Sequence, residues 1–244
     1  MTRYKRVLLK LSGGALSGAS TFGFAPEQLE HISKELLSLT DLDVQVGVVV
    51  GGGNIFRGSM AALWGIERAE ADNIGTLSTV VNSLMLRGVL TAKTDREVRV
   101  MTSIPINAVA EPYIRLRAVH HLEKGYIVIF AGGNGQPYVT TDYPSVQRAI
   151  ETRCDAILVA KHGIDGVYEA DPKKDPNARQ YATLSYKDVI AQDINVMDQS
   201  AILLARDHDL PMHIFNFESS GSMERICSGE DLGTLIFYGN SSFH

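Results

Sequence analysis

The stretch Val46 to Gly58, read as VGVVVGGGNIFRG, decides the fold. It opens with an apolar run, which is typical of a strand buried on both faces of a parallel sheet. The glycines Gly51 to Gly53 follow, and without a Cβ atom their N–H groups can approach a bulky anion. Asn54 can cap a following helix, and Arg57 in its first turn offers donors to phosphate oxygens. Together these features predict a phosphate pocket, although a tight connection with a solvent-facing arginine has the same pattern.

The composition is that of an ordinary globular chain. Its 244 residues are 45% hydrophobic and 21% charged, with a formal net charge of −5. These values argue against disorder and against a general nucleic-acid or membrane-surface binder, so an anion would need a local pocket. Cys154 and Cys227 match neither a disulfide framework nor a metal motif. Because the apolar stretch near the N-terminus is too short for a signal peptide or a membrane span, we expect a cytoplasmic protein.

Strands and helices alternate along the chain. Apolar runs predict strands at Arg6 to Leu11, Val46 to Val50, Glu97 to Met101, Tyr126 to Ala131, Ala156 to Ala160, His213 to Asn216 and Thr234 to Phe237. Apolar residues at helical spacing predict helices at Pro26 to Leu39, Ala69 to Thr91 (a buried one), Pro112 to Lys124, Ser145 to Arg153, Tyr186 to Ile190 and Ser200 to Asp207. The polar segment Gly163 to Ala178 predicts a surface loop. This order indicates an α/β fold with a mainly parallel sheet covered on both faces.

Glycine turns follow three of the predicted strands, after Leu11, Val50 and Ala131. Ligands of parallel α/β folds bind at the carboxyl ends of the strands, so we expect these turns to meet at one cleft. Lys10 interrupts the first strand, where an unpaired ammonium would be costly to bury. It either meets a phosphate there or reaches solvent from an edge strand. At about 4 Å a lysine and a phosphate charge attract by about 4 kcal/mol at an intermediate dielectric, against about 0.3–1 kcal/mol from a helix terminus.

Two aspartates each admit two roles. Asp72 can accept hydrogen bonds from a sugar diol or serve as a helix N-terminal carboxylate. Asp142 can orient a lysine or magnesium near a reacting phosphate, or cap the helix that follows Thr140 and Thr141. No GxGxxG motif opens the first helix, no GxxxxGK[ST] motif occurs, and neither a Ser-His-Asp triad, a catalytic carboxylate pair nor a histidine metal site is recognisable. A phosphate site in this chain would therefore use another arrangement.

Six segments carry a family resemblance. They are YKRVLLKLSG (Tyr4 to Gly13), GVVVGGGNIFRG (Gly47 to Gly58), AEPYIRLRAVHHLEKG (Ala110 to Gly125), QPYVTTD (Gln136 to Asp142), DGVYEADPKKDP (Asp165 to Pro176) and VMD (Val196 to Asp198). In this order and spacing, over nearly the whole chain, they resemble the bacterial UMP kinases of the amino acid kinase family. The GGGNxFRG, TTD and DGVYxADP segments are what separate these enzymes from the acetylglutamate, aspartate and carbamate kinases.

The resemblance implies a three-layer αβα sandwich around a mainly parallel twisted sheet, the amino acid kinase fold, as a single domain over residues 1–244. A half at about 1–150 would bind the acceptor UMP, and a half at about 151–240 would bind ATP. The implied reaction transfers the γ-phosphoryl group of ATP, bound with Mg²⁺, to UMP in pyrimidine nucleotide biosynthesis. The resemblance further implies an allosteric homohexamer in the cytoplasm that has no other metal and binds neither nucleic acid nor membrane.

Matching positions imply the roles of single residues. The catalytic set would be Lys10, Arg57, Asp142 and Asp198. ATP would contact Lys10, Leu11, Ser12, Gly13, Gly53, Arg57, His162, Tyr168 and Asp171. UMP would contact Gly52, Asp72, Asn134, Gly135, Gln136, Pro137, Tyr138, Val139, Thr140 and Thr141. Such a set suits a phosphoryl transfer that depends on positioning and charge stabilisation, without a covalent enzyme intermediate.

Some positions depart from the family pattern: Gly14, Asn134, Gln136, Tyr143, Pro144 and His162. Gly14 replaces a glutamate and bears on regulation or magnesium geometry, while the changes between Asn134 and Pro144 bear on acceptor selectivity. The alternatives are a relative with an acyl or carbamoyl acceptor, a molybdenum storage protein of this fold and a nucleotide-sensing regulator. Family members commonly respond to GTP and UTP; Arg87, Arg96 and the Arg115 to His121 helix are either effector or interface residues or a solvated basic face.

Overall fold

The computed structural model of the chain describes residues 2–20 and 22–244. The strands are β1 Arg6–Leu11, β2 Gln45–Val50, β3 Val98–Thr102, β4 Glu111–Pro112, β5 Ile127–Ala131, β6 Ala156–Lys161, β7 Tyr181–Ser185, β8 Met212–Asn216, β9 Thr234–Phe237 and β10 Ser242–Phe243. The helices are α1 Gly14–Ser17, α2 Pro26–Asp41, α3 Gly58–Leu63, α4 Arg68–Thr91, α5 Arg115–Glu123, α6 Asp142–Glu151, α7 Tyr186–Ala191, α8 Gln199–Asp207 and α9 Ser222–Cys227.

All these strands belong to one sheet, in the order β10-β7-β9-β8-β6-β1-β2-β5-β3-β4. Neighbouring strands run parallel except at the β8–β9 and β7–β10 pairs, which are antiparallel. The predicted mainly parallel α/β sheet is therefore confirmed. The division into an acceptor half and an ATP half stays a prediction, because a single sheet runs through both.

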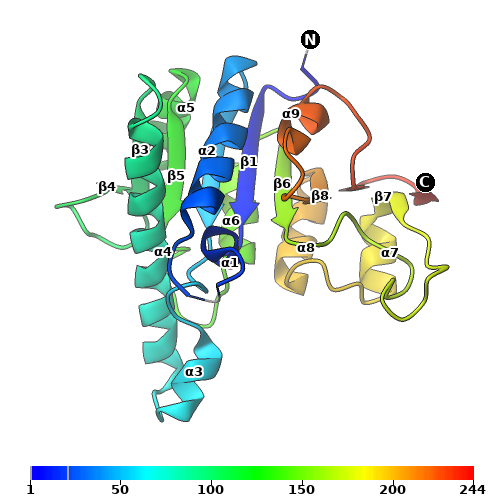
Figure 1. The fold of residues 1–244 in the computed structure, drawn as a ribbon, viewed down its shortest axis with the longest axis horizontal. Helices are drawn as coiled ribbons and strands as arrows, with labels where there is room; N and C mark the ends of the chain where they lie inside the picture. The colour runs from blue at the N-terminus through cyan, green and yellow to red at the C-terminus, as the bar shows by residue number, and fades with distance from the viewer. Residues whose placement is uncertain (1, 21) are drawn as a thin grey trace.

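Helices cover both faces of the sheet and give three layers (Figure 1). Successive side chains of a strand point to opposite faces, so the apolar runs supply two cores. Leu9 and Val48 face the layer of α2, α4 and α9, whereas Leu8 and Val49 face the layer of α5, α6 and α8. This two-sided burial explains why the central strands read as continuous apolar runs.

The central strands end at the same edge of the sheet. β1 lies between β2 and β6 and is parallel to both, with Lys10 opposite Val49 and Val159. In Figure 1 the arrows of β1 and β6 both point toward the end of the molecule that carries α1. The glycine turns after β1 and β2 touch directly, because the Gly51 N–H donates to the Leu11 carbonyl at 2.9 Å.

Helix α4 is half buried, not fully buried as predicted. Its length and composition, with a mean hydropathy of 1.2 over an 18-residue window, would suit a membrane span, yet 39% of that window is buried inside this domain. Val80, Leu86 and Leu90 belong to the core against the sheet. Leu77 and Val81 on the opposite face are each 49% exposed. The apolar spacing indicated the helix correctly, but it could not tell a core face from an exposed apolar face.

Three predicted helix starts were wrong. Asn54 caps no helix, because α3 begins only at Gly58 with Arg57 at its N-cap. Helix α5 begins at Arg115, since the preceding Glu111–Pro112 pairs with β3 as the short strand β4. Helix α6 begins at Asp142, three residues before the predicted Ser145, and ends at Glu151. The helix predicted after the β2 turn corresponds to α3, whereas the short elements α1, α9, β7 and β10 were not predicted, since each is too short to show a periodic pattern.

Candidate functional site

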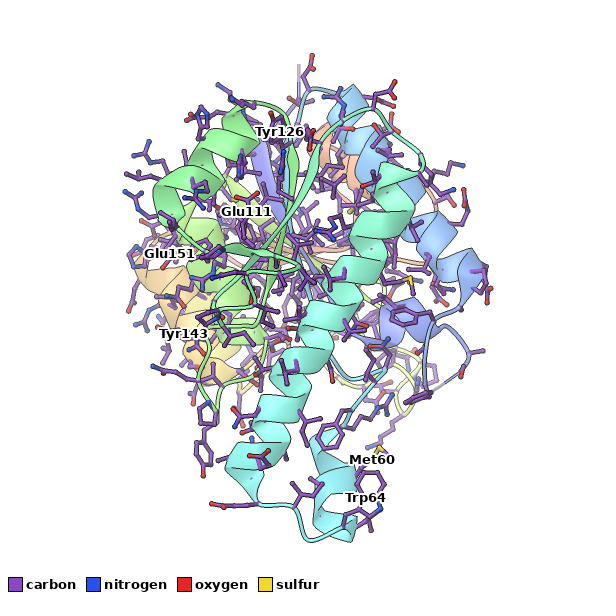
Figure 2. All side chains as sticks on the ribbon, turned by 90° about the vertical axis from the view of Figure 1, so that its left-hand side faces the viewer. Met60, Trp64, Glu111, Tyr126, Tyr143 and Glu151 are labelled. Carbon is purple, nitrogen blue, oxygen red and sulfur yellow. The ribbon has the colours of Figure 1, made fainter. Side chains whose placement is uncertain are left out.

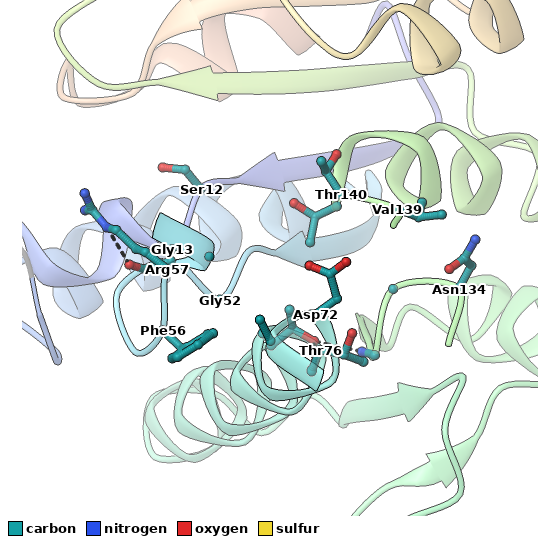
Figure 3. Close-up of a pocket in the computed structure, with 18 of the residues that line it drawn as sticks. Ser12, Gly13, Gly52, Phe56, Arg57, Asp72, Thr76, Asn134, Val139 and Thr140 are labelled. Carbon is teal, nitrogen blue, oxygen red and sulfur yellow. Dashed lines mark hydrogen bonds between the residues drawn. The ribbon is translucent and has the colours of Figure 1, made fainter. Parts of the chain in front are cut away.

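A cavity of about 540 Å³ opens at the carboxyl ends of the strands (Figure 3). We call it the first cavity; its walls are the glycine turns after β1, β2 and β5, together with one face of α4. Its lining residues are Ser12, Gly13, Gly14, Gly52, Gly53, Phe56, Arg57, Gly58, Ala71, Asp72, Gly75, Thr76, Thr79, Gly132, Gly133, Asn134, Gln136, Val139, Thr140 and Thr141. The predicted meeting of the three glycine turns at one cleft is therefore confirmed.

The first two turns pack too closely for side chains. A Cβ atom on Gly13 would lie 2.4 Å from the backbone nitrogen of Gly53, and one on Gly52 would lie 2.6 Å from the carbonyl oxygen of Gly75. These glycines are needed because backbone meets backbone there. The close approach brings N–H groups from two strand ends to one spot, which is the arrangement expected of an anion site.

A buried pair of asparagines holds this arrangement. Asn54 and Asn82 have no exposed surface. The Asn82 amide donates to the Asn54 side-chain oxygen and to the Gly51 carbonyl, each at 2.7 Å, and the Asn54 amide donates to the Gly23 carbonyl at 2.9 Å. Asn54 is thus used to tie the glycine turn to α4, which is why it does not cap α3.

Arg57 lies at the rim of the first cavity with most of its donors free. Its Nε donates to the Gly53 carbonyl at 2.9 Å, the dashed line in Figure 3. Within residues 2–20 and 22–244 its other guanidinium nitrogens have no protein partner. An anion entering the cavity would meet these nitrogens as a fork of donors.

Lys10 is buried in the middle of the sheet and paired. Its side chain is 11% exposed, and its Nζ lies 2.6 Å from Oδ1 of Asp142. The alternative in which Lys10 reaches solvent from an edge strand is therefore wrong, since β1 is central. The other oxygen of Asp142 accepts the Asp198 N–H at 3.0 Å, and the Thr140 hydroxyl donates to the Asp198 carboxylate. Lys10, Asp142 and Asp198, three of the four predicted catalytic residues, thus form one network, and Asp142 does not cap α6.

A second lysine beside this network was missed. Lys161 ends β6, and its Nζ donates to the Val196 carbonyl at 2.6 Å. Burial, and then the nearby Lys10 charge, lower the pKa of Lys161. An added negative charge would stabilise its ammonium form. The sequence contained the signal for this residue. Lys161 directly follows an apolar strand, much as Lys10 interrupts one, but the predicted strand stopped at Ala160.

Lys161 itself lines a second cavity, of about 700 Å³. We call it the second cavity. The surface loop after β6 lines it, including Tyr168 and Asp171, which are two of the residues predicted to contact ATP. His162 is not among its lining residues: it is exposed, with Nδ1 3.3 Å from a Glu218 carboxylate oxygen.

Asp72 joins α4 to the segment after β5. Its carboxylate lines the first cavity and accepts the Tyr138 N–H at 2.8 Å and the Arg68 Nε at 2.9 Å. Asp72 caps no helix, since Glu67 is the N-cap of α4. Tyr138 holds a φ of 66°, a left-handed value that is uncommon outside glycine. Asp72 thus lies just past the first turn of α4, where the helix dipole acts most, and its carboxylate faces the space where a ligand would lie.

The remaining predicted residues divide into two groups. Leu11 is fully buried in the core, so it can offer a ligand only its backbone. Gly135, Pro137 and Tyr138 do not line the first cavity, although Tyr138 lines an adjoining groove of about 550 Å³. Five lining residues were not predicted: Phe56, which follows the β2 turn, and Ala71, Gly75, Thr76 and Thr79 on α4. Only their nearness to Arg57 and Asp72 in sequence could have indicated them.

Comparison with known proteins places the chain in a family. The amino acid kinase family matches residues 5–216. A uridylate kinase of Frankia casuarinae is 58% identical over 97% of this chain and 91% of that protein. The crystal structure of a UMP kinase from Bacillus anthracis superposes with a TM-score of 0.97 at 66% identity over 99% of both chains, and a UMP kinase from Ureaplasma parvum with 0.89 at 29% identity over 96% of this chain and 99% of its own. The chain therefore belongs to the amino acid kinase family, within which it groups with the uridylate kinases.

Proposed function

We propose that the protein transfers the γ-phosphoryl group of ATP to UMP, giving ADP and UDP, in pyrimidine nucleotide biosynthesis. One observation carries the proposal: the buried Lys10–Asp142 pair adjoins both nucleotide-sized cavities, since Ser12 and Thr141 beside it line the first cavity and Lys161, which lines the second, is close enough for the Lys10 charge to lower its pKa; we call Lys10, Asp142 and Lys161 the junction. The relatives named uridylate kinase and UMP kinase support the same reaction. A phosphoryl group moving from one cavity to the other would pass these charges.

UMP occupies the first cavity in this proposal. Its phosphate lies against the Gly52 and Gly53 turn within reach of Arg57, and Asp72 accepts hydrogen bonds from the ribose hydroxyls. The base lies along the segment from Asn134 to Thr141, where Asn134, Gln136 and Val139 line the cavity. Asn134 and Gln136 depart from the family pattern in this segment. The preference for UMP over other acceptors is therefore the first point to test.

ATP occupies the second cavity in this proposal, with its phosphates directed at the junction. Tyr168 and Asp171 lie where the adenine and ribose would bind. Ser12 and Gly13 lie just past β1 and offer the phosphates a hydroxyl and backbone N–H groups. The first cavity is lined by residues between 12 and 141 and the second by residues between 161 and 214, which supports the predicted acceptor and ATP halves.

In the proposed reaction an oxygen of the UMP phosphate attacks the γ-phosphorus as the bond to the departing ADP oxygen breaks. The developing negative charge lies between the two nucleotides, and Lys10, Arg57 and Lys161 are the cations around that position. Asp142 and Asp198 hold Lys10 and Thr140 in place, so the cation is oriented before the reaction. Positioning and charge stabilisation supply the acceleration, and no residue forms a covalent intermediate.

Magnesium enters in this proposal with ATP. Within residues 2–20 and 22–244 no group of three or more His, Cys, Asp or Glu side chains is close enough to hold a metal ion. The carboxylates in the Lys10 network, Asp142 and Asp198, offer the hard oxygen ligands that Mg²⁺ takes, though each already accepts hydrogen bonds. These residues fit an ion held mostly by phosphate oxygens and water. When bound, Mg²⁺ would neutralise part of the phosphate charge.

The homohexamer, the cytoplasmic location and the response to GTP or UTP remain proposals drawn from the family. Arg87 donates to the Val109 carbonyl and Arg96 to the Thr40 carbonyl, so both have roles within the subunit. Light scattering would test the hexamer, and rates with added GTP or UTP would test the allosteric response.

A coupled ADP-release assay with UMP, CMP, acetylglutamate and carbamate as acceptors tests the proposal. We expect UMP to give the highest kcat/KM, with UDP identified as the product by chromatography. ADP release that depends on acetylglutamate or carbamate and not on UMP would refute it. Metal analysis of the purified protein is the companion test, since a molybdenum content near one per chain or more would favour the storage alternative.

A further inference from the structure

Helix α6 carries a buried arginine that faces the first cavity from behind. Arg148 is 6% exposed. Its guanidinium lies over the ring of Tyr113 at 3.8 Å, and its Nη1 lies 2.6 Å from Oε2 of Glu151. Tyr113 follows β4 and Glu151, labelled in Figure 2, ends α6, so two separate segments hold the guanidinium in one orientation.

The carboxylate of Glu151 is held in turn by three donors. The Tyr113 hydroxyl donates to it at 2.5 Å, Arg148 at 2.6 Å and the Gln147 amide at 3.0 Å. Burial, and then the hydrogen bond to Glu151, raise the pKa of Tyr113, so its hydroxyl keeps the proton it donates. The charges of Arg148 and Glu151 balance each other inside the network, and the hydrogen bonds hold both groups in place.

Another donor of Arg148 reaches the wall of the first cavity. Its Nη2 donates to the Gly133 carbonyl at 3.3 Å, and Gly133 lines that cavity. Gly132 and Gly133 both have left-handed backbones, with φ values of 76° and 56°. A glycine pair has little conformational preference of its own, so its shape must be set by its neighbours.

Two further contacts fix the same turn from other elements. The Gly132 N–H donates to the Thr79 hydroxyl of α4 at 2.9 Å, and the Ser103 hydroxyl donates to the Gly132 carbonyl at 2.6 Å. Among the described residues, Arg148 supplies the only side-chain hydrogen bond to the Gly133 carbonyl. It therefore controls the last backbone group before Asn134, where the segment along the acceptor begins.

We propose that Arg148, fixed by Glu151 and Tyr113, is a positioning residue that acts through the Gly133 carbonyl to shape the acceptor site. The inference rests on the proposed function in taking the occupant of the first cavity to be UMP. No residue of α6 or of the glycine pair lines the second cavity, so the effect falls on the acceptor and not on ATP. A lysine cannot replace Arg148, because a single ammonium lacks the planar fork that reaches Glu151 and Gly133 together.

The first test is Arg148→Lys, with KM measured for each nucleotide. We expect the KM for UMP to rise about tenfold, which is about 1.4 kcal/mol, and the KM for ATP to stay within about twofold. Arg6→Lys is the matched control. Arg6 is also a buried arginine, 8% exposed, and donates to Gln45 at 2.7 Å and to the Thr152 carbonyl, but it lies at the opposite end of β1. Its replacement should lower stability and leave both KM values unchanged.

The second test does not need turnover. The Gly135 N–H donates to the Gly132 carbonyl at 2.9 Å, so amide hydrogen exchange at Gly135 reports on the turn. Exchange should be at least about tenfold faster in Arg148→Lys than in Arg6→Lys. If Arg148→Lys fails to fold, Glu151→Gln tests the same point. It keeps an oxygen for Tyr113 but loosens Arg148, and it should raise the KM for UMP in the same direction.

The outcomes separate the two proposals. Equal rises of both KM values, no rise of either, or equal Gly135 exchange in Arg148→Lys and Arg6→Lys would overturn the role of Arg148. A wild-type protein that neither phosphorylates nor binds UMP would refute the proposed function instead. In that case the exchange measurement still decides whether Arg148 shapes the turn.

Discussion

Replacement of Lys10 by methionine tests the charged junction most sharply. Methionine keeps the unbranched apolar stem in the middle of the sheet, so the change removes little besides the ammonium group. A lysine about 4 Å from one phosphate charge contributes about 4 kcal/mol at an effective dielectric of about 20, which is about a thousandfold in rate. Asp142 lies 2.6 Å from Nζ and offsets part of that charge. We therefore expect kcat to fall between about tenfold and a thousandfold.

The same change has a predictable cost in stability. Asp142 is left with a carboxylate that is only 17% exposed and has lost its countercharge. Breaking a buried pair from one side typically costs about 3–5 kcal/mol, and here less, because Asp142 still accepts the Asp198 N–H. Lys10→Met with Asp142→Asn removes both charges, so it should recover most of the lost thermal stability without recovering turnover.

A steady-state ADP-release assay, with thermal unfolding followed by circular dichroism, measures both effects. Lys93→Met is the matched control. Lys93 also pairs with a carboxylate, Glu30 at 2.5 Å, but it lies after α4 and away from both cavities. It should change neither quantity appreciably. A folded Lys10→Met protein with kcat within about twofold of the wild type would refute the reasoning about the junction.

Three further predictions address single residues. Asp72→Asn should raise the KM for UMP about tenfold or more, as a hydrogen bond to a charged group is lost; an unchanged UMP dependence with impaired use of ATP would show that the two sites are reversed. Gly13→Ala should lower kcat and the thermal midpoint, because its Cβ would lie 2.4 Å from Gly53, whereas Gly88→Ala, on α4 away from both cavities and with no atom within 4 Å of its Cβ, should lower neither. Burial lowers the pKa of His213 to about 3 in the folded protein, whereas in the unfolded chain its pKa is about 6.5. Between these two pH values only the unfolded chain binds the proton. The free energy of unfolding should then fall by about 1.4 kcal/mol per pH unit from about 6.5 toward 3; urea titrations that give the same slope in His213→Gln would contradict this.

The long, periodic parts of the fold were predictable from sequence. The central strands are buried on both faces, so they read as unbroken apolar runs, and α2, α4 and α8 show helical spacing. The exposed face of α4 could not be told from its core face, because Leu77 and Val81 are as apolar as the buried residues. Short elements such as β4 and α9 depend on tertiary contacts and leave no local pattern. Glu35 illustrates this, since it accepts the Gly221 and Met223 N–H groups at the start of α9 from a distant helix.

The candidate site was predictable where chemistry follows from position along a strand. Lys10 and the glycine turns could be predicted because parallel strands end at one edge. The open roles of Asp72 and Asp142 could not be decided, since capping and ligand contact need the same residue type. Asn54 was misread for a related reason. Its partner Asn82 is 28 residues away in sequence, and no local pattern indicates that the two amides bind each other.

Binding of a bisubstrate analogue, uridine and adenosine joined through a polyphosphate bridge, tests most directly whether the two cavities share one reaction centre. In calorimetry we expect one molecule to bind per chain, competition by ATP alone and by UMP alone, and weaker binding to both Lys10→Met and Arg57→Ala. An analogue that competes with only one nucleotide, or binds two per chain, would contradict a shared centre.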